Sequence, residues 1–435
     1  MLEEIRSAMR MPSKSISIRK PDKKSVSLFL WLNMNLITAA VRFVFNRFGI
    51  SSGIEREIVI FLATCIPFIV LLIGSRRCVV HKETFVFWGL YLTVALAASL
   101  SLLLYPNLKE FYFRETYGIE PVFRLDGAIF AFLFFVLFDD SEKLRKVLMV
   151  TAYVTFFYLV FVVLLPALRR GGFDDVAPGG GTAKFQYSLS LGYDLLLPLT
   201  LFFTSALKTR KLMHYGLALI CAILIVIYGG RGAIVVMALF FALLLLLKIL
   251  KRKLTVGNIM LVSGLVLIMA VIVVFGEHLL TLLKCALEQN QISSRNIQRF
   301  LSGSFTDPNG RDLIWKQVTE AIGKGGLFGY GFFGDRQFGV SVNYVGYAHN
   351  LFLELLANFG IIGACIIVYF LVDAVRMLFL CKDENWKMIY IVLFICSCKL
   401  LFSLSLWYAW EIWAAAAVAY KYRMLKRTGR LLAYN

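Results

Sequence analysis

Long apolar segments recur along almost the whole sequence and are separated by short polar breaks. Most are long enough to cross the roughly 30 Å hydrocarbon layer of a bilayer as a helix. A chain that is 59% hydrophobic and only 17% charged is outside the range of soluble globular proteins. We therefore predict an all-α polytopic membrane protein with about 12 transmembrane helices, at 26–48, 57–74, 84–104, 126–138, 146–166, 186–206, 215–230, 232–250, 257–275, 350–379, 386–404 and 407–421.

The basic residues of the chain are distributed in the way that membrane topology predicts. A formal net charge of +19 suggests nucleic acid as a partner, but the basic residues form short clusters between apolar segments instead of one stripe. With a cytoplasmic N-terminus, every cluster falls on the cytoplasmic side, as the positive-inside rule requires. The clusters are 14–24, 76–82, 208–211, 248–253 and 421–430. We predict no nucleic-acid partner and two cytoplasmic termini.

The predicted helices divide the chain into five parts. A basic cytoplasmic segment at 1–25 precedes nine helices within 26–275, and three more helices within 349–421 precede a basic cytoplasmic tail at 422–435. Between the two helical parts lies one large extracytoplasmic loop, 276–348. It is too long for a simple connector and is expected to carry its own helices. One of these should start after Gly310 and end in the glycine-rich stretch 323–334.

His349 and Asn350 stand where this loop meets the next apolar segment. An imidazole at the mouth of a membrane helix can exchange protons near neutral pH and still reach a membrane-anchored substrate. The alternative is an interfacial histidine that only anchors the helix. Tyr347, two residues earlier, could contact a substrate or serve as an ordinary interface residue.

Arginines on the same predicted side of the membrane suggest an anionic ligand. Arg231 lies in a Gly-Gly-Arg-Gly turn between two apolar helices, where a buried guanidinium needs an anionic partner. The planar guanidinium fork suits phosphate, which suggests a diphosphate group. Each arginine could instead be a solvated or snorkelling surface charge. The large loop adds Arg295, Arg299, Arg311 and Arg336, and Trp315 follows Arg311 on the same helical face. No Asp-x-Asp motif or carboxylate cluster suited to Mg²⁺ is present, so we predict no metal cofactor.

Together these motifs resemble the signature of a family. His349-Asn350 followed by Gly360 and Gly363, the turn at Arg231 and the run from Gly310 to Trp315 are similar to motifs of the O-antigen ligase and O-antigen polymerase superfamily of bacterial envelopes. Gly329-Tyr330-Gly331 belongs to the same pattern. The resemblance covers about 228–421 and implies a GT-C-like fold. It also implies metal-independent, inverting glycosyl transfer from an undecaprenyl-diphosphate-linked oligosaccharide on the outer face of the cytoplasmic membrane.

The resemblance also implies roles for the residues. Arg231 and Arg311 would stabilise the diphosphate leaving group, and His349 would accept the proton of the attacking hydroxyl or bind the diphosphate as a cation. Substrate contacts would come from Arg295, Arg299, Arg336, Asn350, Tyr347 and Trp315. We favour polymerisation of O-antigen or capsular repeat units, with a chain-length regulator as a partner left open. The alternative within the family is a ligase that acts on a lipid A core or another acceptor in lipopolysaccharide biosynthesis.

Two other classes of protein are compatible with many helices. A transporter or flippase of lipid-linked glycans would spread its charges through the helices, whereas here they gather at one face and in one loop. Asp194 and Lys399 lie within apolar segments and could form either a proton path or an interior ion pair. A receptor or scaffold would not require arginines at membrane-embedded turns.

Overall fold

The computed structural model describes residues 22–49, 53–74, 82–114, 117–176, 182–251, 277–278, 280–289, 294–307, 310–339 and 346–433. The longer helices of these parts are α2 (Lys23–Leu32), α3 (Met34–Arg47), α4 (Ile54–Gly74), α5 (Lys82–Leu104), α9 (Ser141–Tyr158), α12 (Leu196–Thr209), α13 (Leu212–Tyr228), α14 (Arg231–Lys251), α17 (Arg311–Lys324), α19 (Leu351–Val375), α20 (Glu384–Ser397) and α21 (Trp410–Arg427). Shorter helices are α6 (Lys109–Tyr112), α7 (Glu120–Phe123), α8 (Phe130–Val136), α10 (Leu165–Arg169), α11 (Leu189–Asp194), α16 (Arg295–Leu301) and α18 (Arg336–Gly339). The predicted helical class is confirmed apart from one hairpin.

That hairpin corrects the all-α prediction. Strand β1 (Phe173–Val176) pairs antiparallel with β2 (Thr182–Phe185), with Phe173 opposite Phe185. The Phe173 ring is buried against Tyr228, with ring centroids 6.2 Å apart. The hairpin lies between α10 and α11 in a segment expected to be a loop, because two strands of four residues give too weak an alternation to be recognised in sequence.

The described residues contain fewer candidate membrane spans than the twelve predicted for the whole chain. Among the described residues, six helices are long and apolar enough to cross a bilayer. A seventh span arises if α2 and α3, bent by 64° at Asn33, count as one. The apolar helix α13 is shorter than these, and the predicted span 257–275 lies outside the described residues. The chain is a multi-pass membrane protein, but the number twelve is not confirmed.

The predicted span at 126–138 is wrong, because only the short helix α8 forms there. It has seven residues, so its length is roughly 10 Å, well short of the hydrocarbon layer. All seven residues are buried, and the helix packs against α21 instead of facing lipid. Segment 126–138 is apolar because it lies in the centre of the bundle. The backbone carbonyl of Leu137 accepts a hydrogen bond from Lys24 at 3.0 Å, so this segment ends beside the start of α2.

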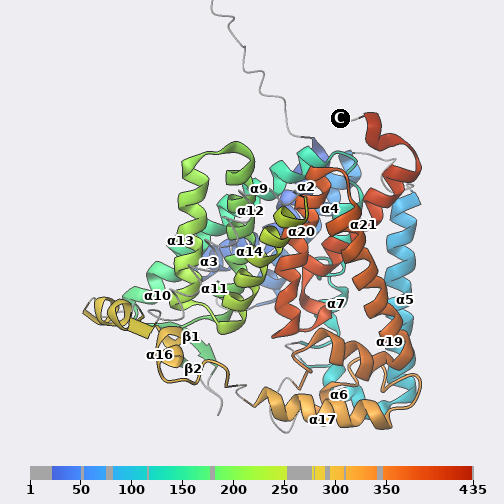
Figure 1. Cartoon of the computed structure of the whole chain (residues 1–435). Coiled ribbons are helices and arrows are strands. Elements are labelled where there is room, and N and C mark those ends of the chain that lie inside the picture. The colour runs from blue at the N-terminus through green and yellow to red at the C-terminus, as the bar shows by residue number, and fades with distance from the viewer. Residues whose placement is uncertain are drawn as a thin grey trace, which may run out of the picture.

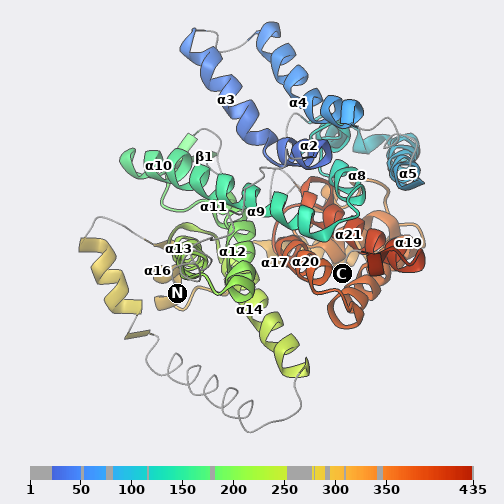
Figure 2. The ribbon, with the colours of Figure 1, turned by 90° about the horizontal axis from the view of Figure 1, so that it is seen from above.

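The helical bundle has two ends with different structures. At one end lie α16, α17 and the β-hairpin, with α17 crossing the ends of the other helices (Figure 1). We call this end the arginine face. The other end, called here the C-terminal face, carries the α12–α13 turn, the start of α20 and the end of α21 (Figure 1). Seen from above, α3 and α4 lie side by side and extend away from the remaining helices (Figure 2).

The predicted loop helix is confirmed as α17. It begins at Arg311, directly after Gly310 in a left-handed conformation with φ 78°, and it ends at Gly325. Figure 1 shows it on the arginine face, beside the start of α19. Arg311 therefore occupies the first helical position, where exposed backbone N–H groups favour anions.

The glycine-rich loop after α17 inserts into a break in α19. At Gly360 the backbone leaves the helical conformation, with φ 53° and ψ −122°. The carbonyls of Ala357 and Asn358 then accept hydrogen bonds from Tyr330 and Gly331 at 2.9 and 2.8 Å. In return, the Ile361 N–H donates to Leu327 at 2.9 Å. The glycine motif at 360 is thus a docking point for the Gly329-Tyr330-Gly331 loop.

Replacing Gly360 by alanine should destabilise the folded protein. An added Cβ would lie 2.3 Å from the Leu327 carbonyl oxygen, and this φ/ψ combination is accessible to glycine alone. Such strain costs about 1–3 kcal/mol, before the clash is counted. We expect a lower thermal midpoint in detergent, followed by size-exclusion chromatography. Gly89→Ala in α5 is the control, because no atom lies within 4 Å of its added Cβ; equal midpoints for both variants would contradict the docking point.

Candidate functional site

The backbone just before His349 is held from two sides. The Ala348 N–H donates to the carboxylate of Asp335 at 2.9 Å, and the Ala348 carbonyl accepts from the Trp315 indole at 3.0 Å. His349 itself adopts a left-handed conformation with φ 51°. Asn350 then caps α19, with its side-chain oxygen accepting from the N–H groups of Phe352 and Leu353. The histidine position is therefore set by α17, the glycine-rich loop and α19 together.

The His349 ring lies in an apolar and cationic environment. His349 is only 7% exposed, and its ring packs on the ring of Tyr347, with centroids 4.2 Å apart. Burial, aided by the positive charge of Arg311, lowers the pKa of His349 to about 3. The imidazole is therefore neutral near pH 7 in the substrate-free protein. A neutral imidazole can accept a proton.

Arg311 lies at the centre of the charged part of the site. Its charge acts on His349 and Tyr347, which share one segment, and on Arg231, which comes from another part of the chain. It also acts on Tyr193 in α11. Arg311 thus joins the histidine region to the group of arginines, as its position at the start of α17 requires.

Arg231 starts α14 and is covered by the loop that follows α16. Its guanidinium donates to the carbonyls of Ser304, at 3.4 Å, and of Phe305. The charges of Arg299, Arg311 and Arg295 act on it, opposed by the carboxylate of Asp307. Four arginines from three helices therefore share one region of the arginine face, which we call the arginine cluster: Arg231, Arg295, Arg299 and Arg311.

Helix α16 is fastened to the turn that precedes Arg231. The Asn296 side chain donates to the carbonyls of Val226 and Gly229 at 3.1 and 2.7 Å. Arg295 packs its guanidinium on the Tyr187 ring at 4.2 Å. The large loop is thus attached to the membrane helices at the point where the Gly-Gly-Arg-Gly turn emerges.

Comparison with known families matches this same region of the chain. The model of the O-antigen ligase family matches residues 216–368, from within α13 to within α19. This stretch, called here the matched region, is about a third of the chain and is similar to the O-antigen ligase family. No curated protein and no solved structure matches the chain.

The matched region contains every site residue predicted from sequence, but it does not bring all of them together. Arg336 is 1% exposed and donates to the carbonyl of Tyr117 and, at 2.9 Å, to the Tyr408 hydroxyl. Its guanidinium also lies 3.3 Å from the centre of the Phe333 ring. These contacts fix the glycine-rich loop to the connections around Tyr117 and Tyr408, which lie between helices. Arg336 thus has a structural position outside the arginine cluster.

Three other predicted substrate contacts also have structural roles in this region. Trp315 holds the Ala348 carbonyl, and Asn350 caps α19. Tyr347 lies 6% exposed between the rings of Tyr117 and His349. They position the histidine, and the arginine cluster provides the more accessible polar groups.

Two acidic residues outside the predicted site support the matched region. The carboxylate of Asp335 accepts the Ala348 N–H. Glu354 accepts from the Ser405 hydroxyl and, at 3.1 Å, from the Leu406 N–H, both on the segment between α20 and α21. Only the adjacency of Asp335 to Arg336 offered a signal in sequence.

The intramembrane charges form interior pairs. Lys399 lies 2.8 Å from Glu411, and both side chains are buried, with Asp194 close enough to act on the lysine charge. This arrangement favours the ion-pair alternative over a proton path. Within the described residues, no group of three or more His, Cys, Asp or Glu side chains could hold a metal ion.

Proposed function

We propose that this protein transfers a glycan from an undecaprenyl-diphosphate-linked oligosaccharide to a sugar hydroxyl, and that it polymerises O-antigen or capsular repeat units. The observation that carries the proposal is the arginine cluster beside a buried neutral histidine inside the matched region. Guanidinium groups can bind a diphosphate, and a neutral imidazole can accept the proton of a hydroxyl. The site would face the outside of the bacterial cytoplasmic membrane, with both termini inside.

The reaction is a single displacement at the anomeric carbon. The acceptor oxygen forms a bond to this carbon while the bond from carbon to the diphosphate oxygen breaks, so configuration inverts. The electron pair of the broken bond goes to the diphosphate, where Arg231 and Arg311 stabilise the added charge. The proton of the acceptor hydroxyl goes to His349. The arginines supply the charge stabilisation for which other transferases use a metal ion, so the proposal includes metal independence.

A second role for His349, binding the diphosphate as a cation, is less well supported. In the substrate-free protein both burial and Arg311 oppose protonation, so the pKa is about 3. An imidazolium at this position would have to form against an adjacent guanidinium. Proton acceptance requires no such step.

A small apolar groove offers a place for the part of the donor lipid next to the diphosphate. It has a volume of about 110 Å³ and lies between α19, α20 and α21, starting at Leu351 and Phe352, directly after the histidine. Phe370, Phe394 and Ile412 line it further along the helices. A polyprenyl chain entering here would keep its diphosphate close to His349 on the arginine face.

Polymerase and ligase are distinguished by the acceptor. Purified protein is incubated with undecaprenyl-diphosphate-linked repeats, with and without a lipid A core, in the presence of EDTA. We expect a ladder of products from the repeats alone, because the donor lipid-linked repeat also serves as the acceptor. Product only with the core would make the protein a ligase, and a need for added Mg²⁺ would refute metal independence. Movement of intact lipid-linked repeats across vesicles without transfer would indicate a flippase.

A further inference from the structure

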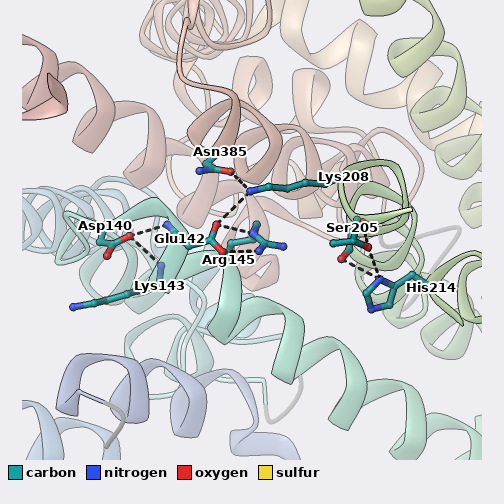
Figure 3. Close-up of polar contacts among 9 residues, drawn as sticks. Asp140, Glu142, Lys143, Arg145, Ser205, Lys208, His214 and Asn385 are labelled. Atoms are coloured by element: carbon teal, nitrogen blue, oxygen red, sulfur yellow. Dashed lines mark hydrogen bonds and ion pairs between the residues drawn. The ribbon is translucent and has the colours of Figure 1, made fainter. Parts of the chain in front are cut away.

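A second charged cavity lies on the C-terminal face, at the end of the bundle opposite to the arginine cluster. It has a volume of about 590 Å³ and is formed by α9, α12, α14 and α20. The polar residues at its edge are shown in Figure 3, where Lys208 reaches from α12 toward Glu142 on α9 and Asn385 on α20. The proposed transfer reaction makes no use of this cavity.

The charged side chains that line the cavity are mostly basic. Four cationic residues contrast with one acid, Glu384; they are Arg145, Lys208, Lys248 and Lys387. Glu142 binds Arg145 at 2.6 Å and Lys208 at 3.4 Å, so one carboxylate serves two cations (Figure 3). A net positive charge therefore remains along the cavity wall, and this charge favours the binding of an anion.

Lys387 is the strongest sign of a missing anionic partner. It lies in the first turn of α20 and is only 5% exposed, yet it lines the cavity. In the part of the chain that the structure describes, its ammonium makes no hydrogen bond and no ion pair. The side chain is largely buried, and its ammonium is accessible only from the cavity side, so an anion bound in the cavity would stabilise this charge.

The remaining wall of the cavity is apolar and opens toward the bilayer. Phe203, Phe241 and Leu244 line it, and the segments that contribute them are membrane-spanning candidates. Leu207 and Phe241 are 48% and 37% exposed beside it. A ligand that fits both walls has an anionic head and apolar chains. Inorganic phosphate or a nucleotide would leave the apolar wall uncovered.

We propose that this cavity binds an anionic phospholipid, with its phosphate between Lys208, Lys248 and Lys387 and its acyl chains along α12 and α14. Basic pockets between membrane helices bind such head groups in this way. The lipid would fill the space between α9, α14 and α20 and brace the C-terminal face. The site is separate from the arginine face, so donor binding does not depend on it.

Lipid retention tests the proposal. The full protein is purified in nanodiscs of phosphatidylcholine with one fifth phosphatidylglycerol, transferred to detergent, and analysed by native mass spectrometry for retained lipid. Wild-type protein should retain phosphatidylglycerol in preference to phosphatidylcholine. The double variant Lys248→Gln, Lys387→Met should lose this preference, since each lysine near a membrane surface contributes roughly a fivefold change in affinity.

A control variant on α9 separates binding in the cavity from an effect of general surface charge. Lys143→Gln with Lys146→Gln removes two charges from α9 outside the cavity and should leave the preference unchanged. If this control lost the lipid preference equally, the preference would come from general surface charge, and the proposed site would be wrong. Displacement of the lipid by excess inorganic phosphate would identify a soluble anion instead. If Lys387→Met fails to fold, the exposed Lys248→Gln carries the test alone, with a roughly fivefold loss expected.

Discussion

Replacing Arg311 by glutamine should lower the rate of glycan transfer by roughly 10²–10³-fold, the usual cost of removing one preorganised donor from a developing negative charge. Arg311 begins α17, and its charge reaches both His349 and Arg231. Without it the diphosphate would lose the arginine of the cluster whose charge also acts on His349. The initial rate of product formation from purified lipid-linked repeats measures the effect.

Two further variants make this test specific. Arg311→Lys keeps the charge but loses the planar fork, so its rate should fall between those of wild type and glutamine. Lys316→Gln removes an exposed charge from the same helix and should leave the rate unchanged. If Arg311→Gln folds and transfers glycan at the wild-type rate, Arg311 is a surface charge and the diphosphate site lies elsewhere.

Replacing His349 by asparagine should reduce the turnover rate by about 10²–10⁴-fold, the range for loss of a general base. Asparagine is the appropriate substitute because it tolerates the left-handed backbone found here, with φ 51°. The substrate concentration at half-maximal rate should change little. A large rise in that concentration with unchanged turnover would instead show that His349 binds the diphosphate.

The pH dependence of the transfer rate should follow from the pKa of His349. Because the pKa of His349 is lowered to about 3, the imidazole is already neutral above this value, and the rate should not fall as pH decreases through 6.5. Arg311→Gln removes one of the two causes of the lowered pKa, so it should move the acid limb of the pH–rate profile upward. A wild-type rate that drops sharply near pH 6.5 would contradict a buried neutral base.

The sequence predicted the helices well because hydropathy reports burial from water. It could not separate burial in lipid from burial in protein, and α8 was therefore taken for a span although it packs against α21. Helix α17 was predictable because its ends are local, with Gly310 before it and Gly325 after it. The hairpin gave no comparable local signal.

Within the site, residue type was predictable and spatial grouping was not. Sequence motifs singled out Arg231 and Arg311 but grouped Arg336 with the other loop arginines. In the structure Arg336 is bound by Tyr117 and Tyr408, which lie far away in the chain. Asp335 was overlooked because its partner is a backbone N–H, which no side-chain pattern reveals. Only the folded loop distinguishes a supporting arginine from an accessible one.

The double anchoring of the Ala348 peptide has a consequence for how substrates are selected. Trp315 ties this peptide to the helix that carries Arg311, so the proposed proton acceptor and the proposed diphosphate-binding arginine are held at a fixed spacing. The spacing between leaving group and base is then the same for every donor. Discrimination among sugars must arise in parts of the protein outside this pair of residues, and new sugar specificities could be introduced there without disturbing the chemistry.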